Sequence, residues 1–352
     1  MIRLGIVGAG NIVRSRHLPA LQRAKDRYSI CGIVDRAEPR AREVARAFGI
    51  PRWDCFDASD LASISWLGDV DALLVATTPM THGLIVRQAL AAKKHVLVEK
   101  PFVVDLAEGQ LAIEAAEQAN LILALNHNFQ FSLGFTALQR DLSRGALGEI
   151  RGYYSLQLSN DTRRLPSWCE VLPLGLFYDE SPHVMYLLRR FAGETSLQHV
   201  AHVPSSVPTR ATPHVLTLTY DCKGIPATVH IDFESPVCEW YFSVLGSKAF
   251  AHVDLFRDIY MVLPNDGQHL MREVLRTSGL ATLQHWRGFV RNGLSYVRGN
   301  LFYGFDAVHR NFADAVRTGT TEPVSLHSGA DGLAVNVMQH AVVQRATSLC
   351  AK

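Results

Sequence analysis

Hydrophobic runs alternate with amphipathic stretches along the first third of the chain. Short apolar runs surround Leu4, Ile33, Leu74, Val96 and Ile122. Between them, residues 38–48, 82–92 and 106–119 carry apolar side chains at helical spacing. A regular alternation of strand and helix is typical of a doubly wound parallel sheet with helices on both faces. We therefore predict an α/β domain over residues 1–125.

The pattern changes after Asn126. One helical stretch, 135–144, is followed by strand-like runs at 151–158, 215–221, 227–233, 240–245, 250–255 and 259–263. Turn signals at Lys223-Gly224 and Gly246-Ser247 join consecutive runs as hairpins. Since 352 residues also exceed what one core usually supports, we predict a second, α+β domain over residues 126–352 with a mainly antiparallel open sheet.

Residues 268–303 combine an apolar stripe with positive charge. The apolar positions are Leu270, Val274, Leu280, Leu283, Trp286, Val290, Leu294 and Val297, and the basic ones are Arg272, Arg276, Arg287, Arg291 and Arg298. This pattern predicts one or two basic amphipathic helices, and the glycines in the segment argue against a single rigid helix. We expect the stripe to pack within the second domain or across a subunit interface. A surface for an anionic substrate or for lipid is the alternative.

A glycine pair follows the first predicted strand. Ile2 to Val7 leads directly into Gly8-Ala9-Gly10-Asn11-Ile12-Val13. Gly8 permits a tight turn, and Gly10 lets the backbone approach a pyrophosphate at the next helix N-terminus. The third glycine of the usual fingerprint is missing, because Val13 stands near its place.

An acidic residue ends the second predicted strand, as a dinucleotide site requires. Asp35 follows Ile30-Cys31-Gly32-Ile33-Val34 and could accept both ribose hydroxyls of an adenosine. A cap for the helix at 38–48 would use the same residue type. A carboxylate here favours NAD over NADP, although Arg36 and Arg40 could accommodate a 2′-phosphate if Asp35 turned away.

A lysine stands at the end of another predicted strand. The run His95-Val96-Leu97-Val98 closes on Glu99-Lys100-Pro101, and the proline stops the strand. Carboxyl ends of parallel strands are where open α/β sheets bind small molecules. Lys100 is therefore a candidate ligand-binding residue, although a solvated loop lysine has the same sequence appearance.

An acid and a histidine stand four positions apart farther along the chain. Asp179 and His183 flank Pro182, which fits best in the first turn of a helix. The aspartate could then orient the imidazole of a general acid or base. A capping aspartate beside a core histidine is the structural alternative.

Several of these motifs together resemble the Gfo/Idh/MocA family (glucose-fructose oxidoreductase, inositol dehydrogenase and rhizopine catabolism proteins). The similarity covers most of the chain, and its most specific part is the block from Ala91 to Pro101 that contains Glu99-Lys100-Pro101. Further matches are Gly8 to Ile12, His17-Leu18-Pro19-Ala20-Leu21, Val34-Asp35-Arg36, Thr78-Pro79 with His82, Gly145 to Ile150, and Asp179 with His183.

The resemblance implies a Rossmann domain for NAD, with NADP as the alternative, and a second domain for substrate binding and oligomerisation. It implies hydride transfer between nicotinamide and a secondary alcohol or ketone of a sugar, cyclitol or related polyol. Lys100 and His183 would manage the hydroxyl proton, and Asp179 would position the histidine or bind substrate. Gly8, Gly10, Asn11, Ile12, Asp35, Arg36, Thr78, Pro79, His82, Glu99 and Lys100 would form the cofactor site. A redox-neutral lyase or glycosidase that retains its NAD is a second enzymatic possibility, and a non-catalytic dinucleotide sensor is a third.

The substrate half departs from the family pattern. The usual arginine is replaced by Gln130, and bulky residues occupy the run from Pro173 to Tyr178 that normally contains small ones. His127 could line the nicotinamide pocket or be structural. Arg163 and Arg164 could grip a carboxylate or phosphate of the substrate, or be simply solvated.

Composition excludes several other classes of protein. The net charge of +2 is too small to attract nucleic acid electrostatically. No apolar stretch is long enough to span a membrane. The six cysteines are scattered without a close pair or metal-ligand spacing. We therefore expect a reduced cytoplasmic protein without a metal site, acting on a small molecule, and a homo-oligomer (dimer or tetramer).

Overall fold

The chain forms two compact units in a computed structural model that describes residues 1–58, 60–163, 166–298, 303–321 and 326–350. Unit 1 comprises Met1–Asn128 and Gly304–Val337, and unit 2 comprises Phe129–Tyr303 and Met338–Lys352. We had assigned everything after residue 125 to the second domain, whereas Gly304–Val337 return to the first. The return is not visible in the sequence, because it depends on contacts between segments that are 200 to 292 residues apart.

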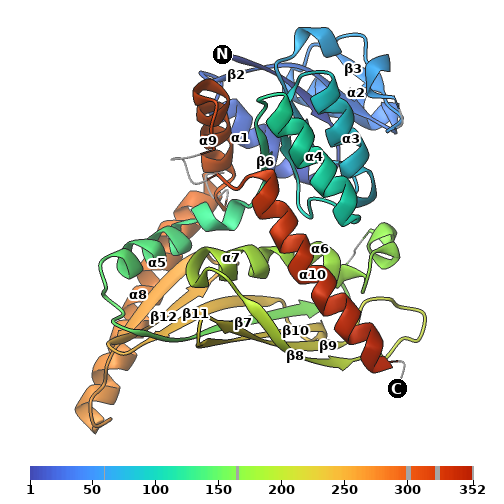
Figure 1. Ribbon diagram of the computed structural model, residues 1–352. Coiled ribbons are helices and arrows are strands. Elements are labelled where there is room, and N and C mark those ends of the chain that lie inside the picture. Colours follow the sequence, from blue (N-terminus) through green and yellow to red (C-terminus); the bar gives the residue numbers. More distant parts are fainter. Residues whose placement is uncertain (59, 164–165, 299–302, 322–325, 351–352) are drawn as a thin grey trace. The chain divides into compact units, whose positions relative to one another are not determined.

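Unit 1 is built on a six-stranded parallel sheet in the order β3-β2-β1-β4-β5-β6 (Figure 1). Its strands are β1 (Ile2–Val7), β2 (Tyr28–Asp35), β3 (Trp53–Cys55), β4 (Ala72–Val75), β5 (His95–Val98) and β6 (Leu123–Leu125). The predicted doubly wound sheet is thus confirmed, and only the short exposed β3 was not foreseen. The strand order reverses between β1 and β4, which is where sheets of this kind bind their ligands.

The helices of unit 1 are η1 (Val13–His17), α1 (Leu18–Arg23), α2 (Glu38–Phe48), η2 (Leu61–Ser63), η3 (Leu67–Asp69), α3 (Pro79–Ala91), α4 (Leu106–Gln118) and α9 (Phe305–Thr318). Helices α3 and α4 lie side by side (Figure 1). Gly5 of β1 and Gly32 of β2 are paired neighbours, and a Cβ on either would lie within 2.7 Å of the Trp66 ring. The two glycines therefore make room for the buried indole in the core.

Unit 2 is built on a seven-stranded mixed sheet in the order β13-β12-β11-β7-β10-β9-β8. Its strands are β7 (Ile150–Asn160), β8 (Ser196–Val203), β9 (Val215–Cys222), β10 (Ile225–Ser235), β11 (Glu239–Gly246), β12 (Ala249–Asp254) and β13 (Ile259–Pro264). Neighbouring strands are antiparallel except β7 and β10, which confirms a mainly antiparallel sheet. We did not predict β8, whose polar sequence hides it.

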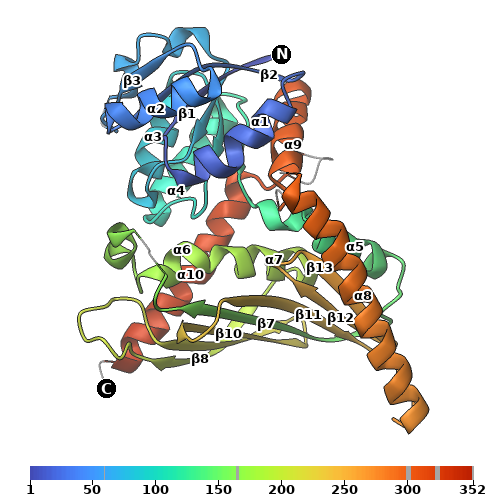
Figure 2. The same cartoon turned by 180° about the vertical axis from the view of Figure 1, so that it is seen from behind.

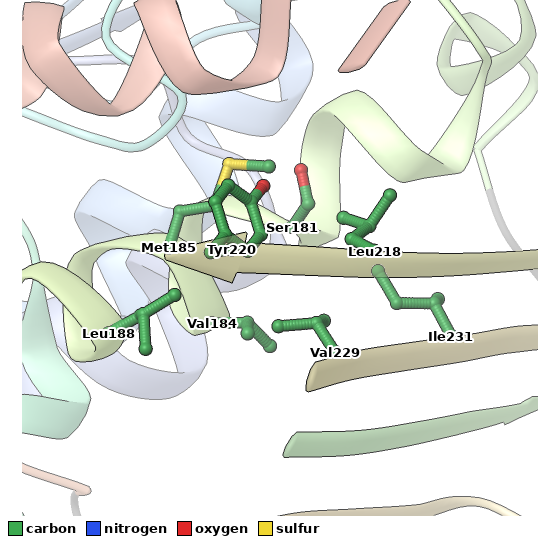
Figure 3. Close-up of a pocket in the computed structure, with 8 residues that line it drawn as sticks. All are labelled: Ser181, Val184, Met185, Leu188, Leu218, Tyr220, Val229 and Ile231. Carbon is green, nitrogen blue, oxygen red and sulfur yellow. The ribbon is translucent and has the colours of Figure 1, made fainter. Parts of the chain in front are cut away.

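Helices of unit 2 are α5 (Leu133–Ser143), η5 (Ser167–Val171), α6 (Leu176–Glu180), α7 (Pro182–Ala192) and α8 (Met271–Val297), with η4 (Asn128–Phe131) at the junction of the units. Helix α10 (Gly329–Cys350) contributes to both units. A small cavity lies under α7 (Figure 3). It is lined by Ser181, Val184, Met185, Leu188, Leu218, Tyr220, Val229 and Ile231. Burial raises the pKa of Tyr220, and the mostly apolar lining marks a packing gap.

Helix α8 is one continuous helix of 27 residues, so the expectation that its glycines would interrupt it was wrong. A Cβ at Gly279 or Gly293 would meet nothing within 4 Å, whereas one at Gly288 would lie 2.9 Å from the Ile259 side chain. Gly288 therefore allows α8 to approach β13 closely. No helix among the described residues is both long and apolar enough to cross a membrane.

Candidate active site

Four loops of unit 1 meet at one edge of its sheet, because parallel strands end on the same side. They follow β1, β4, β5 and β6 and carry, in turn, the glycine pair, Thr78-Pro79, Lys100 and His127. These positions contain most of the residues that we predicted for the cofactor. The sheet thus places them together although they are spread over 120 residues.

The glycine loop has the backbone that a dinucleotide needs. Gly8 has a φ of +107°, and a Cβ on it would lie 2.3 Å from the Ala76 carbonyl oxygen of the loop after β4. A Cβ on Gly10 would meet nothing within 4 Å. Gly8 is therefore required by the fold itself, whereas Gly10 leaves space at the surface. Val13, in place of a third glycine, is the first residue of η1 and is fully buried.

Asp35 is tied to the glycine loop. Its Oδ2 accepts the Ala9 N–H at 2.8 Å and its Oδ1 accepts the Ala37 N–H at 2.8 Å. The exposed guanidinium of Arg40 lies 3.5 Å from Oδ1. The carboxylate is 8% exposed, so its orientation is set by backbone groups on both sides. Oδ2 keeps a second lone pair for another donor, whereas the second lone pair of Oδ1 faces Arg40.

His82 joins two of the four loops. It lies on α3, which begins at Pro79 with Thr78 as N-cap. Its Nδ1 is 2.9 Å from the Pro101 carbonyl oxygen and its Nε2 is 3.2 Å from that of Thr77. Burial lowers the pKa of His82, opposed by these two carbonyls. His82, which we predicted to belong to the cofactor site, thus connects the loop after β4 to the turn that follows Lys100.

Glu99 is buried and accepts three hydrogen bonds. Its Oε1 lies 2.7 Å from Nε2 of His17 and accepts Nδ2 of Asn126 at 2.5 Å, while Oε2 accepts the Lys100 N–H at 3.0 Å. Burial alone would raise the pKa of Glu99, but the hydrogen bond and charge of His17, the charge of Lys100 and the Asn126 amide together hold it below its usual value. The carboxylate therefore anchors the backbone of Lys100 through its charged form.

His17 connects this carboxylate to a segment from the far end of the chain. Its Nδ1 is 3.0 Å from Nε2 of His309 on α9, and the Tyr28 hydroxyl donates to the His309 carbonyl oxygen. Burial, followed by the charge of His17, lowers the pKa of His309 well below its usual value. A doubly protonated His17 would donate one hydrogen bond from Nδ1–H to Nε2 of the neutral His309 and another from Nε2–H to Glu99.

His127 follows β6 and is buried. Its Nδ1 lies 2.6 Å from Nδ1 of His327, and the two rings meet edge to face. The Leu125 N–H donates to the His327 carbonyl oxygen. Ser328 forms an isolated antiparallel β-bridge with Ala124 of β6. The partner of His127 is thus part of the segment that returns to unit 1, which supports the structural interpretation of this histidine.

Asp179 and His183 lie one turn apart in unit 2. Asp179 is in α6, and Pro182 is the first residue of α7, as we predicted. Ser181 between the two helices has helical backbone angles (φ −60°, ψ −24°). The helical direction therefore continues through the junction, and the two side chains share one side of it.

An aromatic cluster that we did not predict surrounds the imidazole of His183. Its Nδ1 lies 2.9 Å from the Tyr186 hydroxyl, which accepts the Phe129 N–H at 3.1 Å. The rings of Phe129 and Trp240 lie 4.9 and 5.6 Å from that of His183. The hydroxyl oxygen can accept a hydrogen bond from Nδ1–H through its second lone pair. The neutral imidazole then carries its proton on Nδ1 and keeps a lone pair on Nε2. That tautomer is the one a general base requires. Tyr186 stands three residues after His183, a helical spacing that could have indicated it.

Arg163 forms an ion pair with Glu180, the residue after Asp179. Its guanidinium lies 2.8 Å from Oε1 of Glu180, and Glu180 also accepts Gln157 and Ser159. Burial would lower the pKa of Arg163, but the charge and hydrogen bond of Glu180 raise it. This pairing gives Arg163 a role in holding α6. The predicted Arg164 lies outside the described residues, and among those described no cluster of three potential metal ligands occurs.

Comparison with known proteins supports an NAD-binding fold for residues 2–127. Residues 2–127 match a family model described as an oxidoreductase family with an NAD-binding Rossmann fold, named GFO_IDH_MocA. A dTDP-3,4-didehydro-2,6-dideoxy-alpha-D-glucose 3-reductase of Streptomyces violaceoruber is 30% identical over 150 residues, covering 43% of this chain and 42% of the relative. A myo-inositol 2-dehydrogenase of Thermotoga maritima is 29% identical over 194 residues, covering 55% of each. The chain thus spans about half the length of these curated relatives.

Solved structures match the fold over nearly the whole chain. An oxidoreductase from Agrobacterium radiobacter in complex with NAD⁺, L-tartaric acid and magnesium has a TM-score of 0.76 at 19% identity and covers 98% of this chain and 96% of its own. The WlbA dehydrogenase from Bordetella pertussis, in complex with NADH and UDP-GlcNAcA, also scores 0.76 at 18% identity, with 99% and 96% covered. At these identities the likeness confirms the two-part fold.

Proposed function

We propose that this protein is an NAD-dependent oxidoreductase, because residues 2–127 match the model of the Gfo/Idh/MocA oxidoreductase family with its NAD-binding Rossmann fold. It would transfer hydride between nicotinamide and a secondary alcohol or ketone of a sugar, cyclitol or related polyol. Relatives named as a deoxysugar 3-reductase and an inositol dehydrogenase support that substrate class. The observation that carries the proposal is Lys100, held at the carboxyl end of β5 by the buried Glu99.

The residues at the sheet edge fit a dinucleotide. The open space at Gly10 and the positive φ of Gly8 form a cradle that a Cβ would fill or distort. Oδ2 of Asp35 keeps a lone pair for a ribose hydroxyl, and the charge of the carboxylate would repel a 2′-phosphate. NAD is therefore the proposed cofactor, with Arg40 as the group that could admit NADP. When bound, the nicotinamide supplies the site that accepts or gives the hydride.

The chain's own residues would handle the proton. In the oxidative direction, Lys100 hydrogen-bonds the reacting hydroxyl, and Nε2 of His183 takes its proton. Tyr186 fixes the imidazole through Nδ1, and Asp179 positions it or binds substrate. The pairing of Arg163 with Glu180 holds α6, which carries Asp179. A positioned acid or base of this kind contributes about 10²- to 10⁴-fold to the rate.

Reduction of NAD⁺, followed by absorbance, against a panel of sugars, cyclitols and nucleotide sugars tests the proposal. Lys100→Met and His183→Asn should each lower turnover by about 10²- to 10⁴-fold and leave dinucleotide affinity nearly unchanged, because both act on the substrate hydroxyl. Near wild-type turnover in either variant would refute the role of that residue. Cleavage of a glycoside without net NADH would point to the redox-neutral lyase, and NAD binding without any turnover would point to a sensor.

A further inference from the structure

Helix α8 turns its polar side to the sheet and its apolar side away from it. The Gln284 amide accepts the Val262 N–H at 2.8 Å and donates to the Val262 carbonyl oxygen at 3.0 Å, on the edge strand β13. Nδ2 of Asn292 donates to the carbonyl oxygens of Arg257 and Asp258 at 2.8 and 2.7 Å. Gln284 thus pairs with the free N–H and carbonyl groups of the edge strand, as a neighbouring strand would. Asn292 pairs with carbonyl groups of the turn before that strand. Of the two arrangements that we expected for the apolar stripe, packing within the second domain is thus excluded, and packing across a subunit interface is left.

The apolar side of α8 is exposed over its whole length. Nine large side chains are between 52% and 85% exposed: Met271, Leu275, Leu283, Trp286, Phe289, Val290, Leu294, Tyr296 and Val297. At 100° per residue they occupy about half of the helix circumference. The N-terminal turns of α8 also extend beyond the strands of the unit 2 sheet (Figures 1 and 2).

The exposed area is large enough for a stable protein interface. A half-exposed large side chain presents roughly 60–120 Å² of apolar surface, so nine of them present about 800 Å². The largest apolar patch on a typical monomer is about 300–600 Å², whereas one partner of a standard interface contributes about 800 Å². We propose that the apolar side of α8 binds the α8 helix of a second copy of this chain, in an antiparallel pair.

The stripe is complementary to itself in that arrangement. Leu283 and Val290 repeat at a seven-residue interval, as do Gly279, Trp286 and Gly293, which is the spacing of a helix-pairing seam. With the two-fold axis between positions 284 and 285, Leu283 faces Trp286 of the other copy and Val290 faces Gly279. A Cβ at Gly279 or Gly293 would meet nothing within 4 Å, so larger side chains of the other copy can pack against these two glycines.

The arginines favour a protein partner over a lipid surface. Arg276 stands seven positions before Leu283, so it lies on the apolar side of the helix. Burying a guanidinium among acyl chains is costly, whereas arginine is enriched at protein interfaces, where its stem packs and its head remains solvated.

Disulfide trapping tests the pairing directly. In Gly279→Cys with Val290→Cys, the two cysteines are about 16 Å apart along one helix, too far to bridge within a chain. Oxidation should yield a covalent dimer that reductant dissolves, while the wild-type chain and each single variant should not. Single variants that cross-link as well as the double variant would establish a parallel pair and overturn the proposal.

Disruption of the seam tests the same interface in solution. Leu283→Glu with Val290→Glu should weaken association by about 30-fold or more, so that the variant sediments at half the wild-type mass. Leu111→Glu, at an α4 side chain that is 50% exposed, is the matched control and should keep that mass. Circular dichroism checks that the fold is retained, and Trp286→Ala provides a milder second variant.

Equal masses of wild-type protein and double variant would overturn the proposal. Sedimentation of the wild-type protein with phosphatidylglycerol vesicles, lost in the double variant while both remain monomeric, would assign the stripe to a lipid surface instead. We expect no vesicle binding, and Arg287→Glu with Arg291→Glu should accordingly leave vesicle sedimentation unchanged.

Discussion

Replacing Glu99 by glutamine should destabilise unit 1 far more than the loss of one surface charge would. The carboxylate accepts donors on both oxygens: His17 and Asn126 on Oε1, and the Lys100 N–H on Oε2. Glutamine has the same shape, but one oxygen becomes an NH₂ group, so in either amide orientation two donors face each other. A lost hydrogen bond to a charged group is worth about 1.5–3 kcal/mol, and a buried unsatisfied donor costs about 1–3 kcal/mol.

We therefore expect Glu99→Gln to lower the free energy of unfolding by about 3 kcal/mol at neutral pH. Glu108→Gln is the control, because Glu108 and Arg87 are more than a third exposed and 3.4 Å apart. Its loss should stay below about 1 kcal/mol. Denaturant unfolding followed by circular dichroism measures both. A Glu99→Gln protein as stable as the wild type would refute the reasoning.

The pH dependence gives an independent check of the same interaction. Folding lowers the pKa of Glu99, so its contribution to stability is complete above the unfolded-state pKa of about 4.5 and is lost as the pH falls through the folded-state pKa. The difference between wild type and Glu99→Gln should accordingly be constant near neutrality and shrink in stronger acid. A difference that persisted undiminished near pH 2 would show that the charge of Glu99 is not its source.

Three further predictions test the site. Asp35→Ser should weaken NADH binding and narrow or reverse the preference over NADPH in fluorescence titrations, because the repelling carboxylate is gone; tighter NADPH binding by the wild type would overturn the NAD assignment. Tyr186→Phe should lower kcat more than it changes KM and shift the pH profile of kcat, since the partner of Nδ1 of His183 is removed; an unaltered profile would contradict this positioning role. Gly8→Ala should fail to fold stably, whereas Gly10→Ala should fold and lose dinucleotide affinity, because only the first Cβ meets backbone; equal stability of the two in thermal melts would argue against that distinction.

Local patterns in the sequence determined the order and type of most elements. Continuous apolar runs predicted β1, β2, β4, β5 and β6, which are buried on both faces. Alternating runs predicted most of the second sheet, and stripes of helical period predicted the helices, because each such segment buries one face. Pro182 and the Gly8 loop could be interpreted from backbone constraints that act within a few residues. The carboxyl ends of parallel strands then brought Lys100 and Asp35 to one edge without any knowledge of side-chain contacts.

Contacts between distant segments were decided only by the tertiary structure. The pairing of His17 with both Glu99 and His309 joins positions up to 292 residues apart, and no local pattern specifies such a partner. The same holds for the return of Gly304–Val337 to unit 1 and for Tyr186 and Trp240 around His183. The outward direction of the α8 stripe was hidden for a related reason: periodicity shows that a helix has an apolar side, but not which side the neighbouring strand requires. Here Gln284 bonds to the backbone of the edge strand β13 and Asn292 to the backbone of the turn before it, so these hydrogen bonds fix the polar side of the helix toward the sheet.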